Sequence, residues 1–266
     1  MEFVTNNIFK EDTYDTPEGR RSWFNKLMGG CRFDFYRRNF WVFIKTGTVA
    51  KFGRLDAQNQ VKFSTQNIIA TERCGGKIHL RNLNKLRALN GKTVVFVSNH
   101  MSLLETGIVH AFIRPHVDFS FVVKESLLRV PFFGNILRAM NAVGVARQNP
   151  REDLKKVLTD GVEVLKMGRS MIIFPQSTRS ENFSPEEFNS IGVKLAKSAG
   201  VPVVPMALKT NFVKTGKKFR DLGPVDINEE IYFDFGDPIE VTGNGKEAQQ
   251  QVIDFIQSRL DEWCKK

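Results

Sequence analysis

The sequence has few cysteines and no long apolar run, and both absences narrow what the protein can be. Its three cysteines, Cys31, Cys74 and Cys264, are far apart, and no C-x-x-C pair occurs among the 266 residues. This pattern argues against a disulfide framework or a zinc cluster and favours a reducing, cytoplasmic compartment. No stretch of about 18 apolar residues is present, so we expect no helix that spans a bilayer. The first 15 residues also lack the apolar core of a signal peptide.

Acidic residues are outnumbered by basic ones. Lys and Arg total 39 against 29 Asp and Glu, which gives a formal net charge of +10. Such a balance favours anionic partners, and nucleic acid, anionic lipid and phosphorylated substrates all satisfy it. No nucleic-acid-binding motif is recognisable, so we expect no nucleic acid among the partners.

Residues 20–53 combine aromatic and basic side chains. Apolar residues first recur there at helical spacing and then form a second cluster. They are Phe24, Leu27, Met28, Cys31 and Phe35, then Phe40, Trp41, Phe43 and Ile44. Two interpretations are open: helices lying in a membrane interface, or helices packed on the main domain with a solvated basic face. We predict an N-terminal helical, membrane-interfacial segment over residues 1–60 and an α/β domain over residues 61–266.

From about residue 92 the pattern alternates between strands and helices. Short apolar runs typical of buried strands are Thr93–Ser98, Phe119–Val123, Ser170–Phe174, Val201–Leu208 and Ile231–Phe235. Helical patterns cover roughly residues 102–113, 125–141, 150–167, 185–200 and 246–263. The alternation predicts an α/β fold with a mostly parallel sheet flanked by helices. Ligands bind at the carboxyl ends of the strands in such sheets.

Capping residues set the expected helix boundaries. Asn149 is a candidate N-cap, with Pro150 at the first helical position. Pro131 should break or kink the helical pattern in which it lies. Ser184 begins a sequence of capping-box form, and Gly200 should end the helix that follows it.

Two strand ends carry unusual groups of polar residues. Asn99 and His100 follow the first of these strands, with Glu105 five residues after the histidine, and Pro175-Gln176-Ser177-Thr178-Arg179 follows the strand that ends at Phe174. A positioned histidine can remove the proton from a hydroxyl as it attacks a thioester. A carboxylate at the other ring nitrogen would fix the tautomer and stabilise the imidazolium. Ser102-x-x-Glu105 also has the form of a capping box, so Glu105 has a structural interpretation as well.

These blocks resemble the lysophosphatidic acid / glycerol-3-phosphate acyltransferase family. Its signature is N-H-x-x-x-x-D, a basic middle block, F-P-E-G-T-R-S and a hydrophobic V-P-[VI]-[VI]-P block. The matching segments here, in the same order, are Asn99–Glu105, Lys124–Arg147, Phe174–Ser180 and Val201–Pro205. The resemblance covers roughly residues 75–240 and implies an acyltransferase that uses an acyl thioester.

The resemblance also implies roles for particular residues. His100 would be the base and Glu105 its orienting carboxylate. Arg147 and Arg179 would hold the acceptor's phosphate, because guanidinium groups bind phosphate with a planar fork. Lys124 would add a further positive charge, and Gln176 and Thr178 would shape the acceptor pocket. The expected donor is acyl-CoA or acyl carrier protein. The expected acceptor is a lysophospholipid, 1-acyl-sn-glycerol 3-phosphate, on the cytoplasmic face of an anionic membrane.

The sequence departs from the family pattern at three positions. Glu105 stands where the family usually has Asp, and Gln176 and Ser177 stand where it usually has Glu and Gly. These changes leave two alternatives open: a different acceptor, such as an amino-lipid or another lysolipid, or a catalytically inactive lipid-binding relative. His110 and His116 have no ligand-like partners in the sequence, so we expect no metal site, and we expect no cofactor.

Overall fold

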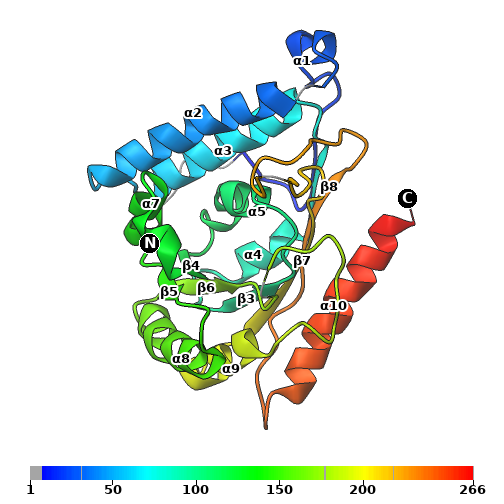
Figure 1. The fold of residues 1–266 in the computed structure, drawn as a ribbon. Coiled ribbons are helices and arrows are strands. Elements are labelled where there is room, and N and C mark those ends of the chain that lie inside the picture. Colours follow the sequence, from blue (N-terminus) through cyan, green and yellow to red (C-terminus); the bar gives the residue numbers. More distant parts are fainter. Residues whose placement is uncertain (1–7, 31, 177, 218, 266) are drawn as a thin grey trace.

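The computed structural model describes residues 8–30, 32–176, 178–217 and 219–265. Within them, strands form one eight-stranded sheet of order β1-β2-β8-β7-β3-β6-β4-β5 (Figure 1). The strands are β1 Tyr14–Asp15, β2 Ile78–Arg81, β3 Val95–Ser98, β4 Phe119–Lys124, β5 Val143–Val145, β6 Ser170–Ile173, β7 Val203–Lys209 and β8 Ile231–Phe235. Strand β1 pairs antiparallel to β2, as does β7 to β8, and the other pairings are parallel. The predicted α/β class with a mostly parallel sheet is confirmed.

Helices cover both faces of the sheet. They are α1 Trp23–Leu27, α2 Arg32–Lys51, α3 Ala57–Arg73, α4 Leu83–Ala88, α5 Leu104–Ile108, α6 His110–Ile113, the 3-10 helix η1 Glu125–Arg129, α7 Phe133–Ala139, α8 Pro150–Lys166, α9 Ile191–Ala199 and α10 Lys246–Cys264. Side chains alternate along β3, so Val95 and Val97 face α8, α9 and α10, whereas Phe96 faces the cluster built by α3, α4, α5 and α6. Each strand of the centre is therefore buried on both sides, which explains its continuous apolar sequence.

The boundaries of the later helices test the capping predictions. Asn149 accepts a hydrogen bond from the Arg151 amide and α8 begins at Pro150, as predicted. Gly200 ends α9 in the left-handed conformation, which is also confirmed. The capping box at Ser184 was wrong, because Ser184 Oγ bonds Glu186 instead and α9 begins at Ile191. Phe183 and Phe188 pack edge to face there, and Phe188 is buried, so packing of a turn overrides the local helix signal.

The N-terminal helices form a pair that lies over one edge of the sheet domain. Helices α2 and α3 pack side by side, and α7 packs against α2 (Figure 1). The apolar pattern of residues 24–35 does not form one helix, because Gly29 and Gly30 adopt positive φ between α1 and α2. Cys31, which belonged to that pattern, lies outside the described residues. The boundary predicted after residue 60 falls inside α3, and the division into two domains stays a prediction.

Helix α2 has one buried face and one face exposed to solvent. Its inner face buries Phe35, Val42 and Ala50, while large apolar side chains of α1 and α2 are exposed to solvent. The exposed residues are Trp23, Leu27, Phe33, Phe40, Trp41 and, just after α2, Phe52; Trp23 is 75% exposed and Phe33 64%. None of the described helices is long and apolar enough to cross a membrane.

Three short strands were not predicted. Strands β1, β2 and β5 contain two, four and three residues, too few to give a clear alternating pattern. Strand β2 places residues of both expected domains in one sheet, because it pairs with β8 on one side and with β1 on the other.

Candidate active site

The two polar groups predicted at the strand ends lie side by side. Strands β3 and β6 are parallel neighbours, so the residues that follow them leave the sheet at the same edge. The backbone amide of His100 donates to the Gln176 side-chain oxygen at 2.8 Å. The backbone amide of Ser180 donates to the His100 carbonyl oxygen at 2.9 Å. The second block thus holds the first at its histidine.

His100 and Glu105 form the pair that the sequence predicted. His100 Nδ1 lies 2.5 Å from Glu105 Oε2. An ionised carboxylate only accepts hydrogen bonds, so Nδ1 carries the hydrogen and Nε2 keeps its lone pair when the ring is neutral. The Glu105 side chain is 0% exposed, whereas that of His100 is 20% exposed. The ring of His100 also stacks on Phe174, with centroids 4.3 Å apart.

Glu105 has a second role beside the histidine. Its Oε1 accepts from the backbone amides of Met101 at 2.7 Å and Ser102 at 2.6 Å. The hydroxyl of Thr210 donates to the same oxygen at 2.6 Å. One carboxylate therefore holds the loop after β3 through Oε1 and orients the imidazole through Oε2. The capping interpretation applies to the first oxygen and the dyad interpretation to the second.

Thr210 was not predicted from the sequence to belong to the site. It directly follows β7, the parallel neighbour of β3 on the other side from β6. Its hydroxyl also accepts from Ser102 Oγ at 3.0 Å. Asn99 ties the same two strands together, because its side chain donates to the Leu208 carbonyl and accepts from the Leu208 amide. A polar residue directly after a third buried strand was the available signal.

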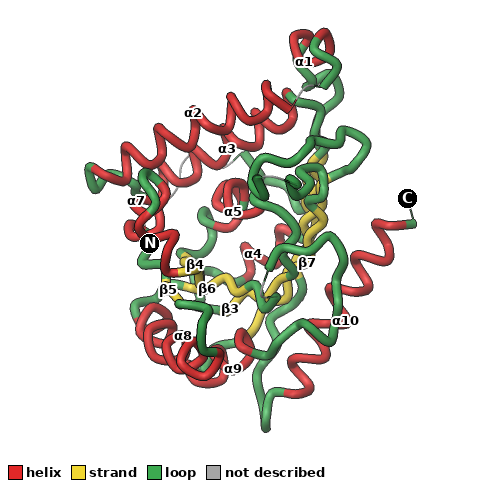
Figure 2. Tube along the Cα trace, viewed as in Figure 1, coloured by secondary structure: helices red, strands yellow, loops and turns green. Residues whose placement is uncertain are grey.

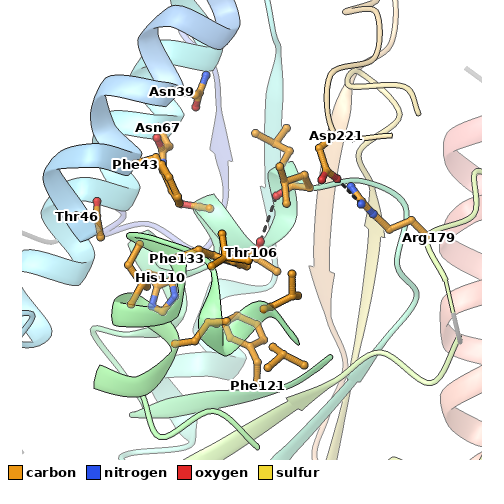
Figure 3. A pocket seen from close by; sticks show the side chains of 18 of the residues that line it. Asn39, Phe43, Thr46, Asn67, Thr106, His110, Phe121, Phe133, Arg179 and Asp221 are labelled. Atoms are coloured by element: carbon orange, nitrogen blue, oxygen red, sulfur yellow. Dashed lines mark hydrogen bonds and ion pairs between the residues drawn. The ribbon is translucent and has the colours of Figure 1, made fainter. Parts of the chain in front are cut away.

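A cavity of about 660 Å³ opens beside His100. All the predicted site residues line it except Glu105, which lies behind the histidine. Inside the cavity the walls are mostly apolar; they include Phe43, Phe63, Phe121, Leu127, Phe133, Ile136, Leu137 and Met140. Figure 3 shows side chains of α2 and α3 on one side of this space and His110, Phe121 and Phe133 on another.

Four basic side chains of the described residues line the cavity: three lie at or after the ends of parallel strands, and the fourth, Arg220, lies between β7 and β8. Lys124 ends β4, Arg147 follows β5, and Arg179 lies in the loop after β6. Arg179 forms an ion pair with Asp221, which also lines the cavity (Figure 3). Asp221 lies between β7 and β8, where the described residues form loops and turns (Figure 2).

Arg147 adopts an unusual backbone conformation. Its φ is 60°, a left-handed value that is uncommon for residues other than glycine. The backbone amides of Ala146 and Arg147 both donate to Asp153 Oδ1, at 3.1 and 3.2 Å. The carboxylate of Asp153, in the first turn of α8, thus stabilises the turn that presents Arg147.

The remaining predicted residues divide into a buried and an exposed one. Gln176 is buried and its side-chain oxygen is bound to the His100 amide, so it positions the histidine as well as lining the cavity. Thr178 is exposed at the cavity wall. Ser177 lies outside the described residues. The described part of the chain contains no group of three His, Cys, Asp or Glu side chains that could hold a metal ion.

Known proteins resemble this chain in sequence and in fold. The family profile described as "Acyltransferase" matches residues 77–209, half of the chain. A 1-acyl-sn-glycerol-3-phosphate acyltransferase of Pseudomonas aeruginosa is 38% identical over 116 residues, which are 44% of each chain. The chloroplastic 1-acyl-sn-glycerol-3-phosphate acyltransferase LPAT1 of Arabidopsis thaliana is 30% identical over 132 residues, 50% of this chain and 36% of the relative. The chain thus spans less than half the length of these relatives.

A solved structure shares the fold. The crystal structure of the 1-acyl-sn-glycerophosphate acyltransferase PlsC from Thermotoga maritima superimposes with a TM-score of 0.69. The similarity covers 90% of this chain and 95% of that one at 18% sequence identity. At such low identity the comparison establishes the fold and not the reaction.

Proposed function

Because this chain belongs to the acyltransferase family, we propose that it transfers a fatty acyl group from acyl-CoA or acyl carrier protein to a lysophospholipid. The acceptor we propose is 1-acyl-sn-glycerol 3-phosphate, and the product is phosphatidic acid. The observation that carries the proposal is the His100–Glu105 pair at an apolar cavity whose wall also holds basic side chains.

The pair suits acyl transfer to a hydroxyl group. The acceptor's oxygen attacks the thioester carbonyl carbon while His100 Nε2 takes the hydroxyl proton, a contribution of about 10²–10⁴ in rate. Glu105 balances the positive charge that the ring then carries. When the tetrahedral intermediate collapses, the carbon–sulfur bond breaks, and the imidazolium returns its proton to the departing thiolate.

Fixed positive charge suits an acceptor with a phosphate group. Arg179 is held in place by Asp221, and an incoming phosphate would replace that carboxylate as its partner. Arg147 and Lys124 would add charge from the ends of two further strands. Guanidinium groups favour phosphate over neutral headgroups because they bind two oxygens at once.

The exposed apolar side chains of α1 and α2 support binding to a membrane surface. Large apolar groups are rarely exposed in such number on one pair of helices, and they lie among Arg and Lys side chains. We propose that the protein lies on the cytoplasmic face of a membrane. Replacing Trp23, Phe33 and Trp41 with Ser should reduce co-sedimentation with anionic vesicles, and high salt should weaken binding by the wild type. Unchanged binding by the triple variant would contradict this.

An assay with labelled acyl donors against a panel of lysolipids and amino-lipids tests the reaction. Purified wild-type protein should acylate 1-acyl-sn-glycerol 3-phosphate faster than neutral or amino acceptors. His100→Ala should lose nearly all transfer while the protein still folds, since the partly exposed His100 ring belongs to neither of the two main core clusters. Preferential acylation of an amino-lipid would identify a different acceptor. Inactivity of the wild type with every donor and acceptor would indicate a lipid-binding relative.

A further inference from the structure

A loop of this chain places a carboxylate on an arginine that we propose binds the acceptor's phosphate. Asp221 pairs with Arg179, and both side chains line the cavity (Figure 3). The side chain of Arg179 is 21% exposed and that of Asp221 is 60% exposed. Asp221 belongs to the β7–β8 loop, residues 210–230, which begins just beyond the residues 77–209 that the family profile matches. The carboxylate therefore comes from outside the matched part of the chain, and an acceptor's phosphate must displace it.

The base of the β7–β8 loop is fixed by several contacts. The Lys214 amide donates to the Pro224 carbonyl at 3.0 Å, and Lys214 Nζ lies 3.1 Å from Asp226 Oδ2. The hydroxyl of Tyr36, on α2, donates to the Gly223 carbonyl at 2.9 Å. These contacts hold both ends of the stretch between Lys214 and Gly223, so that stretch can shift while the base stays in place.

The tip of the loop, residues 215–217 and 219–222, makes weaker contacts with other segments. In these described residues, the polar contacts to the rest of the protein are the Asp221–Arg179 ion pair and a hydrogen bond of 3.5 Å from Arg32 of α2 to the Leu222 carbonyl. A hydrogen bond of that length is weak. An ion pair with an exposed partner also contributes little to stability. Little free energy therefore opposes a small displacement of the tip.

The tip carries exposed apolar and basic side chains. Phe219 is 70% exposed and Leu222 is 52% exposed. Lys217 and Arg220 are exposed as well, and neither forms an ion pair within the described part of the chain. Apolar side chains among cations are the composition that binds an anionic lipid interface, where the apolar groups enter the acyl boundary and the cations meet the headgroups.

The tip also continues the exposed apolar surface of the first two helices. Leu222 lies beside Arg32, and the next residue of α2, Phe33, is 64% exposed. Figure 1 shows the β7–β8 loop beside the end of α2 that is nearer to α1. The surface that we propose rests on a membrane therefore includes the tip, in which Asp221 lies between Phe219 and Leu222.

We propose that the tip of the β7–β8 loop binds anionic membrane lipid and that this binding withdraws Asp221 from Arg179, so that the acceptor site opens at the membrane surface. The inference rests on the proposed acyl transfer to an acceptor with a phosphate group. Burial of Phe219 and Leu222 among acyl chains draws the residues between them towards the lipid. Anionic headgroups attract Arg220 and repel the Asp221 carboxylate. Away from a membrane, Asp221 occupies the place of the acceptor's phosphate.

The test uses a short-chain 1-acyl-sn-glycerol 3-phosphate that stays dissolved as monomers, with and without vesicles of phosphatidylcholine and phosphatidylglycerol. For the wild type, the vesicles should lower the KM for this acceptor about two- to fivefold, the range expected when a partly exposed ion pair no longer competes. Asp221→Asn should have the lower KM without vesicles, and vesicles should change it little further. Asp226→Asn makes the same chemical change at the base of the loop, where Asp226 pairs with Lys214, and should behave as the wild type.

A second set of variants separates opening of the site from membrane binding as such. The double variant Phe219→Ser, Leu222→Ser should keep the wild-type KM without vesicles and lose the decrease that vesicles cause. It is measured at vesicle concentrations where co-sedimentation shows that α1 and α2 still hold it to the membrane. Met167→Ser removes an apolar side chain that is 71% exposed at the end of α8, and it should keep the decrease.

The outcomes separate this inference from the proposed function. Acyl transfer with a KM that neither vesicles nor Asp221→Asn changes would overturn the inference and leave the function standing. The same holds if vesicles lower the KM of Asp221→Asn as much as that of the wild type, because partition of the acceptor into the vesicles then explains the decrease. No transfer to this acceptor under any condition would refute the proposed function, and the inference would fall with it.

Discussion

The sharpest prediction concerns Glu105→Gln, a change of one oxygen to a nitrogen at a fully buried position. In the structure, Glu105 Oε1 accepts three hydrogen bonds from Met101, Ser102 and Thr210. A glutamine must place its oxygen there, because its NH₂ group cannot accept. The NH₂ group then faces His100 Nδ1 and donates to it, so the ring's own hydrogen moves to Nε2.

The consequence for catalysis can be estimated. A histidine protonated at Nε2 cannot accept the hydroxyl proton, and the neutral amide cannot balance an imidazolium. In a Ser-His-Asp triad, the corresponding Asp→Asn change leaves the wrong tautomer and lowers kcat by about 10⁴. We expect a loss of about 10³–10⁴, which corresponds to about 4–5 kcal/mol of activation free energy.

Stability should respond much less than catalysis. The glutamine oxygen still satisfies the two backbone amides and the Thr210 hydroxyl, and a neutral amide costs less to bury than a carboxylate. We expect the free energy of unfolding to change by about 1 kcal/mol. Asp56→Asn is the matched control, since it makes the same chemical change at the N-cap of α3, where Asp56 accepts from Asn59.

Steady-state kinetics and thermal unfolding of both variants decide the matter. The Asp56→Asn enzyme should keep its kcat. A Glu105→Gln enzyme that retains more than a tenth of the wild-type kcat would refute the dyad and leave Glu105 a loop-holding residue. Glu105→Asp should also lower kcat, because the shorter side chain cannot reach both the loop amides and the ring without a backbone shift.

Three further predictions follow from other parts of the structure. Arg179→Lys keeps the charge but loses the planar fork, so the KM for the lysolipid should rise while the donor's KM changes little; unchanged kcat/KM would place the phosphate elsewhere. Gly47→Ala should destabilise the protein by about 1–3 kcal/mol in denaturant unfolding, because a Cβ there would lie 2.5 Å from that of Phe132. Burial, together with smaller effects of Arg114 and Arg87 respectively, holds the pKa values of His110 and His116 at about 3 and 4. Below pH 6.5 both imidazoles take up protons when the protein unfolds, so the free energy of unfolding should fall as the pH drops from 6.5 towards 4. In His110→Phe the slope of that fall should be smaller by up to about 1.4 kcal/mol per pH unit, the contribution of one histidine.

The buried centre of the fold could be predicted from sequence because its strands are apolar on both faces. The patterns at Thr93–Ser98 and Ser170–Phe174 correspond to β3 and β6. The polar residues that follow these two strands lie side by side, because neighbouring parallel strands end at the same edge of the sheet. The edge strands could not be predicted in this way. A four-residue strand such as β2 pairs because tertiary packing brings it to β8, and its sequence IHLR carries little preference of its own.

The site residues that belong to short sequence motifs could be predicted. The residues that contact them from distant segments of the chain could not. His100 and Glu105 are five residues apart, so their pairing depends on one turn of chain. Thr210 lies more than a hundred residues beyond Glu105, to which it donates a hydrogen bond. Asp221 lies about forty residues beyond Arg179, with which it forms an ion pair. The sequence gives no sign of which carboxylate will meet which arginine in a chain with 29 acidic residues.

Two departures from the family's usual motifs meet at His100, and the structure gives each a physical role. The extra methylene of Glu105 lets one carboxylate reach the loop amides with Oε1 and the imidazole with Oε2. Gln176, where the family usually has Glu, still accepts the His100 amide through its neutral oxygen. Glutamine carries no charge, so one negative charge is removed beside the histidine. The positive electrostatic potential that Lys124, Arg147 and Arg179 produce in the cavity is therefore higher than it would be with glutamate at position 176. That balance should strengthen the attraction of an anionic acceptor, because a low-dielectric pocket screens its charges weakly.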